Sequence, residues 1–282
     1  MPESPEVDAL AGFLRARATG RTIRAIELEE FRVLKTRNRR TEELADRTVI
    51  GVRRFGKHVS LDTDGPGLLI SFGRAGWARW ADAGEAETVP DASDAVVAPV
   101  VARITFTDGA EMALTDAGDW LSLGISIADD VTTLPAVADL GPDPTTPAFT
   151  PELLDGLVRG RRKQLKALLQ EQASLAGIGN AYSDEILHAA RLSPTTHASA
   201  LDADQRERLF VAITGVLTAA FDARRDVPID QQKAAKVASM RVHGRTGEPC
   251  PVCGDLVLDV PGSKGAAQYC PTCQNGGRPL EP

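Results

Sequence analysis

Four cysteines near the end of the chain form the pattern with the clearest chemistry. All lie in the last 33 residues, as two Cys-x-x-Cys pairs that sixteen residues separate: Cys250, Cys253, Cys270 and Cys273. Each pair directs two thiolates to one point, and four soft thiolates suit the tetrahedral coordination of zinc. The intervening residues are long enough for a β-hairpin with its tip near 261–265. The sequence therefore predicts one structural zinc ion in this C-terminal module.

The second residue of the chain offers a nucleophile. The sequence begins Met1-Pro2-Glu3, and aminopeptidases usually remove a Met that precedes a small residue such as proline. Removal exposes a secondary amine, and because an α-amine titrates near ~8, a useful fraction is neutral at cellular pH. Such an amine can attack a sugar C1′ and form an iminium, while Glu3 could move protons to or from the sugar. A proline in second position is common by itself, so its meaning depends on the remaining sequence.

A glycine-rich turn between two predicted helices is a candidate phosphate site. One helix is expected to end near Ala176-Gly177, and the next to begin after Asn180. Backbone N–H groups at a helix N-terminus favour phosphate, and the Asn180 side chain adds a donor. Cations that could add positive charge to this candidate phosphate site lie nearby: Arg159, Arg161, Arg162, Lys163 and Lys166. In isolation, however, a turn of this kind is more often only a turn.

The distribution of charge favours a nucleic-acid partner more than the total charge does. The net charge is −7, but residues 15–57 hold 13 Lys/Arg against six Asp/Glu, and residues 81–144 hold 13 Asp/Glu against Arg103 alone. Because phosphate binding depends on the local field, this asymmetry suggests one basic and one acidic face, with ordinary solvated surface as the alternative. No apolar run reaches the ~18 residues of a membrane span, and no leader-like segment opens the chain. We therefore expect a cytoplasmic, nucleoid-associated protein with no membrane contact.

The elements that must position these residues change character along the chain. Residues 4–18 are expected to form an amphipathic helix capped by Ser4, and the short strands that follow are typical of a β-sandwich or barrel. Residues 83–95 are expected to form an acidic loop, and the proline-rich residues 134–150 a linker. Helical patterns then follow at four places: 151–159, 162–173, 180–191 and 201–222. Residues 223–240 show no clear pattern.

Four ordered motifs identify a family. MPESPEV opens the chain, Arg54-Phe-Gly-Lys57-His follows, AGIGNAYSDEIL lies in the helical part, and GRTGEPCPVCG with QYCPTCQ ends it. Over nearly its full length the chain resembles the formamidopyrimidine-DNA glycosylase / endonuclease VIII family. The resemblance implies an α+β multidomain fold with four parts: a catalytic β-sandwich flanked by helices (1–133), a linker (134–150), a helix–two-turn–helix domain (151–240) and a zinc-finger β-hairpin (241–282).

The resemblance also implies a function and residue roles. A damaged base is flipped out of double-stranded DNA and excised, and an iminium at Pro2 then allows β- and δ-elimination of the strand. Glu3 would be the acid/base partner, and Glu6 lies at a family acidic position near the active site. Lys57 and Asn180 would contact phosphate beside the lesion. We expect a monomeric, bifunctional DNA glycosylase and abasic-site lyase.

Three departures from the family pattern argue against assuming 8-oxoguanine as the substrate. The family usually has an Arg near the finger tip, where this chain has Gly265 beside Lys264, and a lysine cannot reproduce a bidentate fork. Arg74 stands where formamidopyrimidine-type members have a Met that fills the space of the flipped base. Trp120 lies in the segment that replaces the loop reading the opposite base; we expect it in the core, with a DNA wedge as the alternative.

Three functions therefore remain open. The first is the bifunctional glycosylase and lyase, and the second is a lyase acting mainly on abasic sites with weak base excision. The third is a non-catalytic protein that senses damaged DNA. The presence of Pro2, Glu3, Lys57 and Asn180 favours chemistry, whereas the absence of a finger-tip Arg favours the second or third function.

Overall fold

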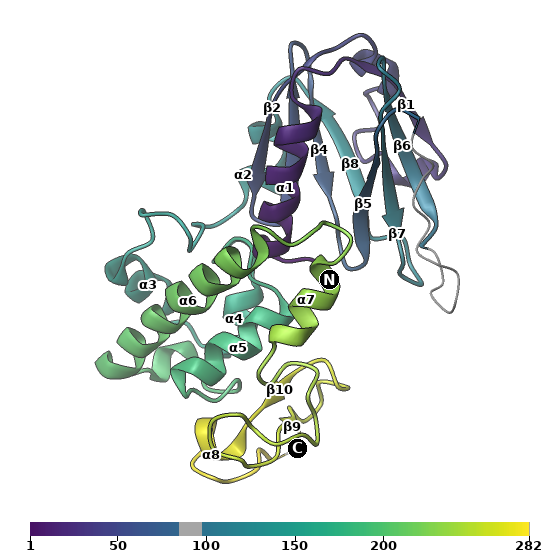
Figure 1. Cartoon of the computed structure of the whole chain (residues 1–282). Coiled ribbons are helices and arrows are strands. Elements are labelled where there is room, and N and C mark those ends of the chain that lie inside the picture. Colours follow the sequence, from purple (N-terminus) through teal and green to yellow (C-terminus); the bar gives the residue numbers. More distant parts are fainter. Residues whose placement is uncertain (85–97, 282) are drawn as a thin grey trace. The chain divides into compact units, whose positions relative to one another are not determined.

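The computed structural model describes residues 1–84 and 98–281, which fold as two compact units (Figure 1). The units are made of these segments: Met1–Ala138 with Pro228–Asp230 in unit 1, and Asp139–Val227 with Gln231–Pro282 in unit 2. Most of the acidic loop expected over 83–95 lies outside the described residues. Within the described ranges, no helix is long and apolar enough to cross a membrane.

Unit 1 opens with helix α1 (Ser4–Ala18), at the expected residues but with a different cap. The N-cap is Glu3, which is extended (φ −124°, ψ −178°) and forms a capping box with Glu6. The expectation that Ser4 caps the helix is wrong, because a reciprocal pair of carboxylates satisfies two backbone donors where one hydroxyl satisfies a single donor. Ser4 is instead buried inside the first turn, and its Oγ has no hydrogen-bond partner among the described residues.

Two four-stranded antiparallel sheets make up the predicted sandwich, which is confirmed. One sheet has the order β1-β6-β7-β5, with β1 (Ile23–Leu28), β5 (Gly76–Ala81), β6 (Val100–Phe106) and β7 (Glu111–Asp116). The other has the order β2-β3-β4-β8, with β2 (Val49–Phe55), β3 (His58–Thr63), β4 (Gly67–Ser71) and β8 (Gly124–Ala128). Four short helices accompany them: η1 (Phe31–Val33), η2 (Thr41–Leu44), η3 (Val131–Thr133) and α2 (Pro135–Ala138).

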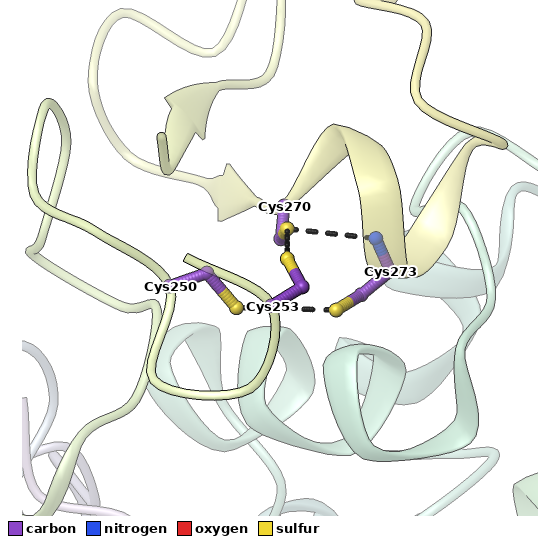
Figure 2. A group of neighbouring side chains, drawn as sticks. All are labelled: Cys250, Cys253, Cys270 and Cys273. Carbon is purple, nitrogen blue, oxygen red and sulfur yellow. Dashed lines mark hydrogen bonds between the residues drawn. The ribbon is translucent and has the colours of Figure 1, made fainter. Parts of the chain in front are cut away.

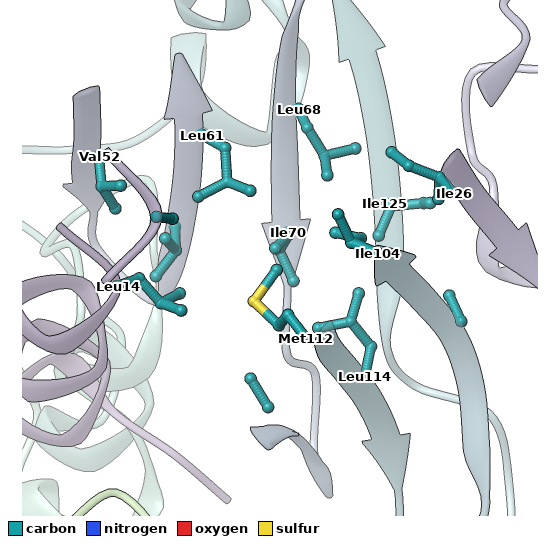
Figure 3. Close-up of a cluster of buried hydrophobic side chains, with 14 of the residues drawn as sticks. Leu14, Ile26, Val52, Leu61, Leu68, Ile70, Ile104, Met112, Leu114 and Ile125 are labelled. Atoms are coloured by element: carbon teal, nitrogen blue, oxygen red, sulfur yellow. The ribbon is translucent and has the colours of Figure 1, made fainter. Parts of the chain in front are cut away.

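The core of unit 1 lies between the two sheets and under α1. Figure 3 shows Leu61 and Ile70 of one sheet and Ile104 and Met112 of the other, with Leu14 of α1 beside them. All five side chains are fully buried. Burying each one contributes roughly 1.5–3 kcal/mol, so this cluster is what holds α1, and the residues before it, in place.

A three-residue segment returns to unit 1 from a distant part of the sequence. Ile229, within Pro228–Asp230, packs against the unit 1 core, and its carbonyl accepts a hydrogen bond of 2.9 Å from Trp77 Nε1. The residues on either side of this segment belong to unit 2. The chain therefore passes between the units three times.

Unit 2 contains the predicted helical region and the cysteine module. Its helices are α3 (Pro151–Val158), α4 (Leu165–Gln170), α5 (Asn180–Ala190), η4 (Ala198–Ala200), α6 (Ala203–Arg224), α7 (Gln232–Ser239) and α8 (Pro271–Gln274). Helix α7 lies in residues 223–240, where the sequence shows no clear pattern. The pattern is obscured because two polar side chains of this helix face inward. Gln232 is buried, and the buried ammonium of Lys236 lies 4.7 Å from the centroid of the Tyr182 ring. The cysteine module adds a two-stranded hairpin of β9 (Leu258–Asp259) and β10 (Gln268–Tyr269).

The basic and acidic stretches of unit 1 are not separate faces. Arg17 pairs with Asp82, and Arg21 pairs with Asp108. Arg39 lies 2.9 Å from an oxygen of Asp129, in the same way. Carboxylates from residues 81–144 thus neutralise part of the basic stretch. The two stretches of unit 1 therefore meet at these ion pairs.

Candidate active site and zinc centre

The proposed nucleophile lies directly before a tightly fixed helix start. Pro2 is half-buried, while Glu3 and Glu6 are almost fully buried, at 1 % and 2 % exposure. The Glu3 N–H donates to Glu6 Oε2 over 3.0 Å. This bond fixes the peptide that joins Pro2 to Glu3. Glu6 therefore holds the start of α1 in place, and Glu3 follows directly after the residue whose amine the loss of Met1 would expose.

Lys57 lies on a tight turn that is tied to α1. Gly56 and Lys57 connect β2 to β3, and Gly56 has φ 53°, as the first position of a two-residue hairpin turn with glycine there requires. Arg54 donates to the Gly56 carbonyl and to Asp8 of α1, both over 3.1 Å. One arginine thus holds the turn of Lys57 against the helix that follows Pro2 and Glu3.

His58, the next residue, stays uncharged near neutral pH. Burial and the neighbouring Lys57 lower the pKa of His58 to about 4. Its Nδ1 lies 2.7 Å from the hydroxyl of Ser71 on β4. Lys57 is therefore the charged group at the end of this hairpin.

Arg74 and Trp120 lie on two neighbouring loops that hydrogen bonds hold in place. Burial of Asp116 opposes its ionisation, but the N–H groups of Leu123, Ser122 and Gly118 together lower the pKa of its carboxyl. Ser122 Oγ in turn accepts from the Arg74 N–H over 2.8 Å. The loops also touch at Gly73 (φ 57°), where a Cβ would lie 2.2 Å from the Ser122 carbonyl oxygen. Only glycine fits that position.

Trp120 is at the surface, so the expectation of a core tryptophan is wrong. Its relative exposure is 85 %, the highest among the large hydrophobic side chains at the described surface. The carboxylate of Asp116 gathers the N–H groups on both sides of Trp120, and this turns the indole outward. Arg74 is also exposed. An exposed indole on a braced loop can stack on a base, because every base has a π-face.

In unit 2, the glycine-rich turn leads into α5 as predicted, with Asn180 as its first helical residue. Gly179 is the N-cap and contributes no side chain. The Asn180 carboxamide is held at both ends, because its Oδ1 accepts from Gln170 Nε2 over 2.9 Å and its Nδ2 donates to the carbonyl of Ala266. Asn180 therefore stands at a helix start, in a fixed orientation and beside the cysteine module.

The two lysines expected to bind DNA have acidic partners inside unit 2. Lys163 pairs with Glu171, and the hydrogen bonds from Lys163, Ser174 and Arg161 lower the pKa of that carboxyl to about 2. Lys166 Nζ lies 2.5 Å from an oxygen of the fully buried Asp184. Lys166 therefore braces the first turn of α5.

The four predicted zinc ligands come together, as Figure 2 shows. All four Sγ atoms lie within 4.8 Å of one another, with Cys253 and Cys270 at 3.3 Å and Cys250 and Cys273 at 3.9 Å. Tetrahedral Zn–S bonds of ~2.3 Å place sulfurs about 3.8 Å apart, so the geometry fits zinc. All four donors are soft thiolates, and such ligands bind zinc in preference to hard cations such as Mg²⁺ or Ca²⁺. The cysteine cluster is thus consistent with a structural zinc site.

Contacts with α5 hold this finger, and sequence reasoning missed them. Both carboxylate oxygens of Glu185 accept backbone N–H groups, from Arg241, Val242 and His243, at 2.9–3.0 Å. Burial nevertheless raises the pKa of Glu185. The Asp184 carboxylate accepts from the Gln268 N–H over 3.2 Å. The sequence signal was the pair of adjacent acids within a helix with apolar neighbours, which only internal partners can stabilise.

The finger tip carries Lys264 and Gly265 side by side in the left-handed region. Lys264 has φ 54° and Gly265 has φ 75°, and both side-chain positions are exposed. A lysine in this conformation is uncommon and adds backbone strain. The expected hairpin is present, and the cation at its tip is Lys264.

A sandwich that begins with Pro2-Glu3, a helix–two-turn–helix unit and a four-cysteine finger together define a DNA glycosylase of base excision repair. Two family models match: the formamidopyrimidine-DNA glycosylase N-terminal domain over residues 1–119, and the formamidopyrimidine-DNA glycosylase H2TH domain over residues 140–228. The chain belongs to the formamidopyrimidine-DNA glycosylase family.

Individual relatives support this assignment. The formamidopyrimidine-DNA glycosylase of Symbiobacterium thermophilum is 31 % identical over 285 residues, covering 97 % of this chain and 89 % of that protein. An uncharacterized formamidopyrimidine-DNA glycosylase-like protein of Mycobacterium tuberculosis is 43 % identical over 141 residues, which are 50 % of this chain and 88 % of the relative. Among solved structures, the Lactococcus lactis glycosylase bound to DNA with an abasic site shares the fold, with a TM-score of 0.81, 24 % identity, and coverage of 97 % of this chain and 99 % of that one.

Proposed function

We propose that this glycosylase is bifunctional: it removes a damaged base from double-stranded DNA and then cleaves the strand through an iminium at Pro2. The observation that carries the proposal is the buried pair Glu3 and Glu6, which fixes the peptide after Pro2 and holds an acid beside its amine. Membership of the family and the similarity to a DNA-bound glycosylase support DNA as the partner. The reaction requires loss of Met1, since an acylated proline nitrogen is not a nucleophile.

Glu3 is the proposed proton carrier of the reaction. The neutral Pro2 nitrogen attacks the sugar C1′, and the bond from C1′ to the damaged base breaks as the base takes a proton from solvent. The sugar ring then opens between C1′ and O4′ to give the iminium, and O4′ gains the proton that the amine nitrogen loses. The Glu3 carboxyl can relay that proton. Loss of a C2′ proton to solvent then expels the 3′ phosphate, and loss of a further sugar proton to solvent expels the 5′ phosphate. Water finally hydrolyses the iminium and frees the Pro2 amine.

Four further residues are proposed to hold the DNA. Lys57 supplies a cation for a phosphate in unit 1, and Asn180 supplies a donor at a helix start in unit 2. Arg74 and Trp120 occupy exposed, braced loop positions and are proposed to fill the space of the flipped base or stack on its neighbours. Zinc, held by the four cysteines, stabilises the finger and takes no part in the bond-breaking steps.

A second candidate, an abasic-site lyase with weak base excision, is favoured by the finger tip. Lys264 is a point charge and Gly265 has no side chain, so this hairpin lacks the planar fork that grips a phosphate with two parallel bonds. Looser positioning of the lesion slows base excision more than attack on an aldehyde that is already exposed.

Borohydride trapping tests the nucleophile. Protein with a mass-verified N-terminal Pro2 should form a covalent adduct with abasic DNA, and Pro2→Gly should bind the DNA but trap it far more slowly. The matched control is the same protein with a short N-terminal extension, which retains the Pro2 side chain but turns its amine into an amide. An extended protein that traps at the full rate would show that another amine is the nucleophile.

A substrate comparison separates the two candidates. Duplexes that carry a formamidopyrimidine, an oxidised pyrimidine or a preformed abasic site are incubated with excess enzyme in single turnover. Base release on a damaged duplex within about tenfold of the rate on abasic DNA supports the bifunctional enzyme. Cleavage confined to abasic DNA supports the lyase.

A further inference from the structure

One face of α5 contacts the finger at every helical turn. Asn180, Asp184 and His188 are four residues apart and therefore lie on the same side of the helix. Asn180 bonds the hairpin at Ala266, and Asp184 accepts from the backbone of Gln268. His188 is the third contact, and it reaches the cysteine cluster itself.

His188 has no evident role in the family chemistry, yet its position is closely defined. Its Nε2 lies 3.3 Å from Cys250 Sγ, and both residues are 3 % exposed. The other ring nitrogen, Nδ1, is buried and has no hydrogen-bond partner in the part of the chain that the structure describes. The sulfur of Cys250 is thus the polar partner toward which the ring is oriented.

The chemistry of a zinc-bound cysteine decides the direction of this bond. A cysteine that binds zinc is a thiolate and has no proton to donate, so the imidazole must be the donor through Nε2–H. Four thiolates around one Zn²⁺ leave a net charge of −2, and an N–H donor stabilises that charge at the buried Cys250. A donor of this kind also withdraws electron density from the sulfur and makes it less reactive toward protons and electrophiles.

We propose that His188 is a positioning residue of the zinc centre, whose Nε2–H holds the Cys250 thiolate and slows loss of the metal. The inference goes beyond the proposed DNA chemistry and depends only on zinc occupying the cysteine cluster. Removing a residue that hydrogen-bonds to a metal ligand typically lowers metal affinity by about 10–100-fold.

Zinc release tests the proposal without any DNA. Full-length, zinc-loaded protein is mixed with excess chelator, and the metal transferred is followed with a colorimetric indicator. His188→Phe removes the donor but keeps a buried ring and should release zinc about tenfold faster. His188→Gln retains an N–H near the same position and should release zinc close to the wild-type rate. The matched control, His197→Phe, changes an exposed histidine of the same unit and should leave release unchanged.

Three outcomes would overturn the proposal. Wild-type release from His188→Phe would show that the hydrogen bond does not retain metal. Equal acceleration in the Phe and Gln variants would show that ring packing, not the donor, is responsible. Wild-type protein that binds no zinc would remove the premise, and because strand cleavage is not measured, none of these outcomes bears on Pro2.

A measurement on the unaltered protein covers the case in which the variants do not fold. Cysteine sites also accept cadmium, so the finger is loaded with ¹¹³Cd and its histidines are labelled with ¹⁵N. The proposal expects His188 as the Nε2–H tautomer, with a scalar coupling from that proton to the metal across the hydrogen bond to sulfur. The Nδ1–H tautomer, or a missing coupling in the metal-loaded protein, would refute it.

Discussion

The starts of α1 and α5 use the same backbone geometry for different purposes. Helix α1 is closed by its own acids, because Glu3 and Glu6 form a capping box across the first turn. Helix α5 has Gly179 at its cap and a neutral carboxamide, Asn180, as its first side chain. A helix start favours negative charge, which α1 supplies with Glu6, whereas α5 has no acidic side chain in its first turn. The two starts thus differ in their caps, which fits the roles proposed for them: α1 positions an acid, and α5 receives a phosphate.

Removing zinc should unfold the finger that contacts α5 and leave unit 1, which contains α1, folded. Structural zinc contributes about 10–16 kcal/mol to the folding of small finger modules, so Cys253→Ser or prolonged chelation should unfold the hairpin that carries Ala266 and Lys264. Zinc content and DNA affinity should both fall. All three tryptophans lie in unit 1, so their fluorescence should stay unchanged. One zinc per chain in Cys253→Ser would contradict the four-thiolate site.

Changing Glu3, the acid at the start of α1, should slow the chemistry and leave DNA binding intact. Glu3→Gln keeps the size of the side chain but removes its proton transfer, which is worth about 10²–10⁴-fold in rate. Base release in single turnover should fall by that factor, while the dissociation constant for abasic DNA changes little. Glu30→Gln is the matched control, since Glu30 belongs to a different helix start, that of η1. A Glu3→Gln enzyme with full base release would remove Glu3 from the chemistry.

Acid should weaken unit 1 through His58. Its folded-state pKa of about 4 lies below the usual ~6.5, so the unfolded chain binds a proton that the folded chain excludes. The stability from neutral His58 is fully present above about pH 6.5 and is lost as the pH falls toward 4, by up to about 3 kcal/mol. Urea titrations followed by tryptophan fluorescence at pH 7 and pH 4.5 should show this loss. His58→Asn should lose less between the two pH values, and His197→Phe should behave like the wild type.

The two phosphate contacts should differ in their response to salt. Lys57→Ala removes a cation, so the slope of log affinity against log salt should become shallower by about 0.9. Asn180→Ala removes a neutral donor and should weaken binding by about 1.5–3 kcal/mol with the slope unchanged. Filter binding from 50 to 200 mM salt measures both quantities. Equal slopes for the wild type and Lys57→Ala would mean that Lys57 does not contact phosphate.

Much of this architecture could be predicted because local chemistry determines it. The Cys-x-x-Cys spacing predicts the metal cluster, and the short strands with turn signals predict the sandwich. The helical pattern places α5 within one residue of its observed end. The role of each residue in DNA contact stays a prediction that the experiments above address.

Three features could not be predicted, because they depend on contacts between residues that are distant in sequence. Trp120 looked like a core residue by its hydrophobicity, but the hydrogen bonds of Asp116 turn its loop outward. His188 is 62 residues from the sulfur it faces, so no local pattern could reveal that contact. Helix α7 was missed because Lys236, a residue typical of surfaces, is buried against the ring of Tyr182.

The return of Ile229 to unit 1 limits how this protein can exchange parts with its relatives. The indole N–H of Trp77 donates to a segment encoded 152 residues later, between α6 and α7. A chimaera joined at residues 138 and 139 would inherit Trp77 from one parent and the residue opposite it from another. Because the side chains of Trp77 and Ile229 both pack against the unit 1 core, recombination within the family should keep these two positions together. Unit 1 is one module in space although it is two in the gene.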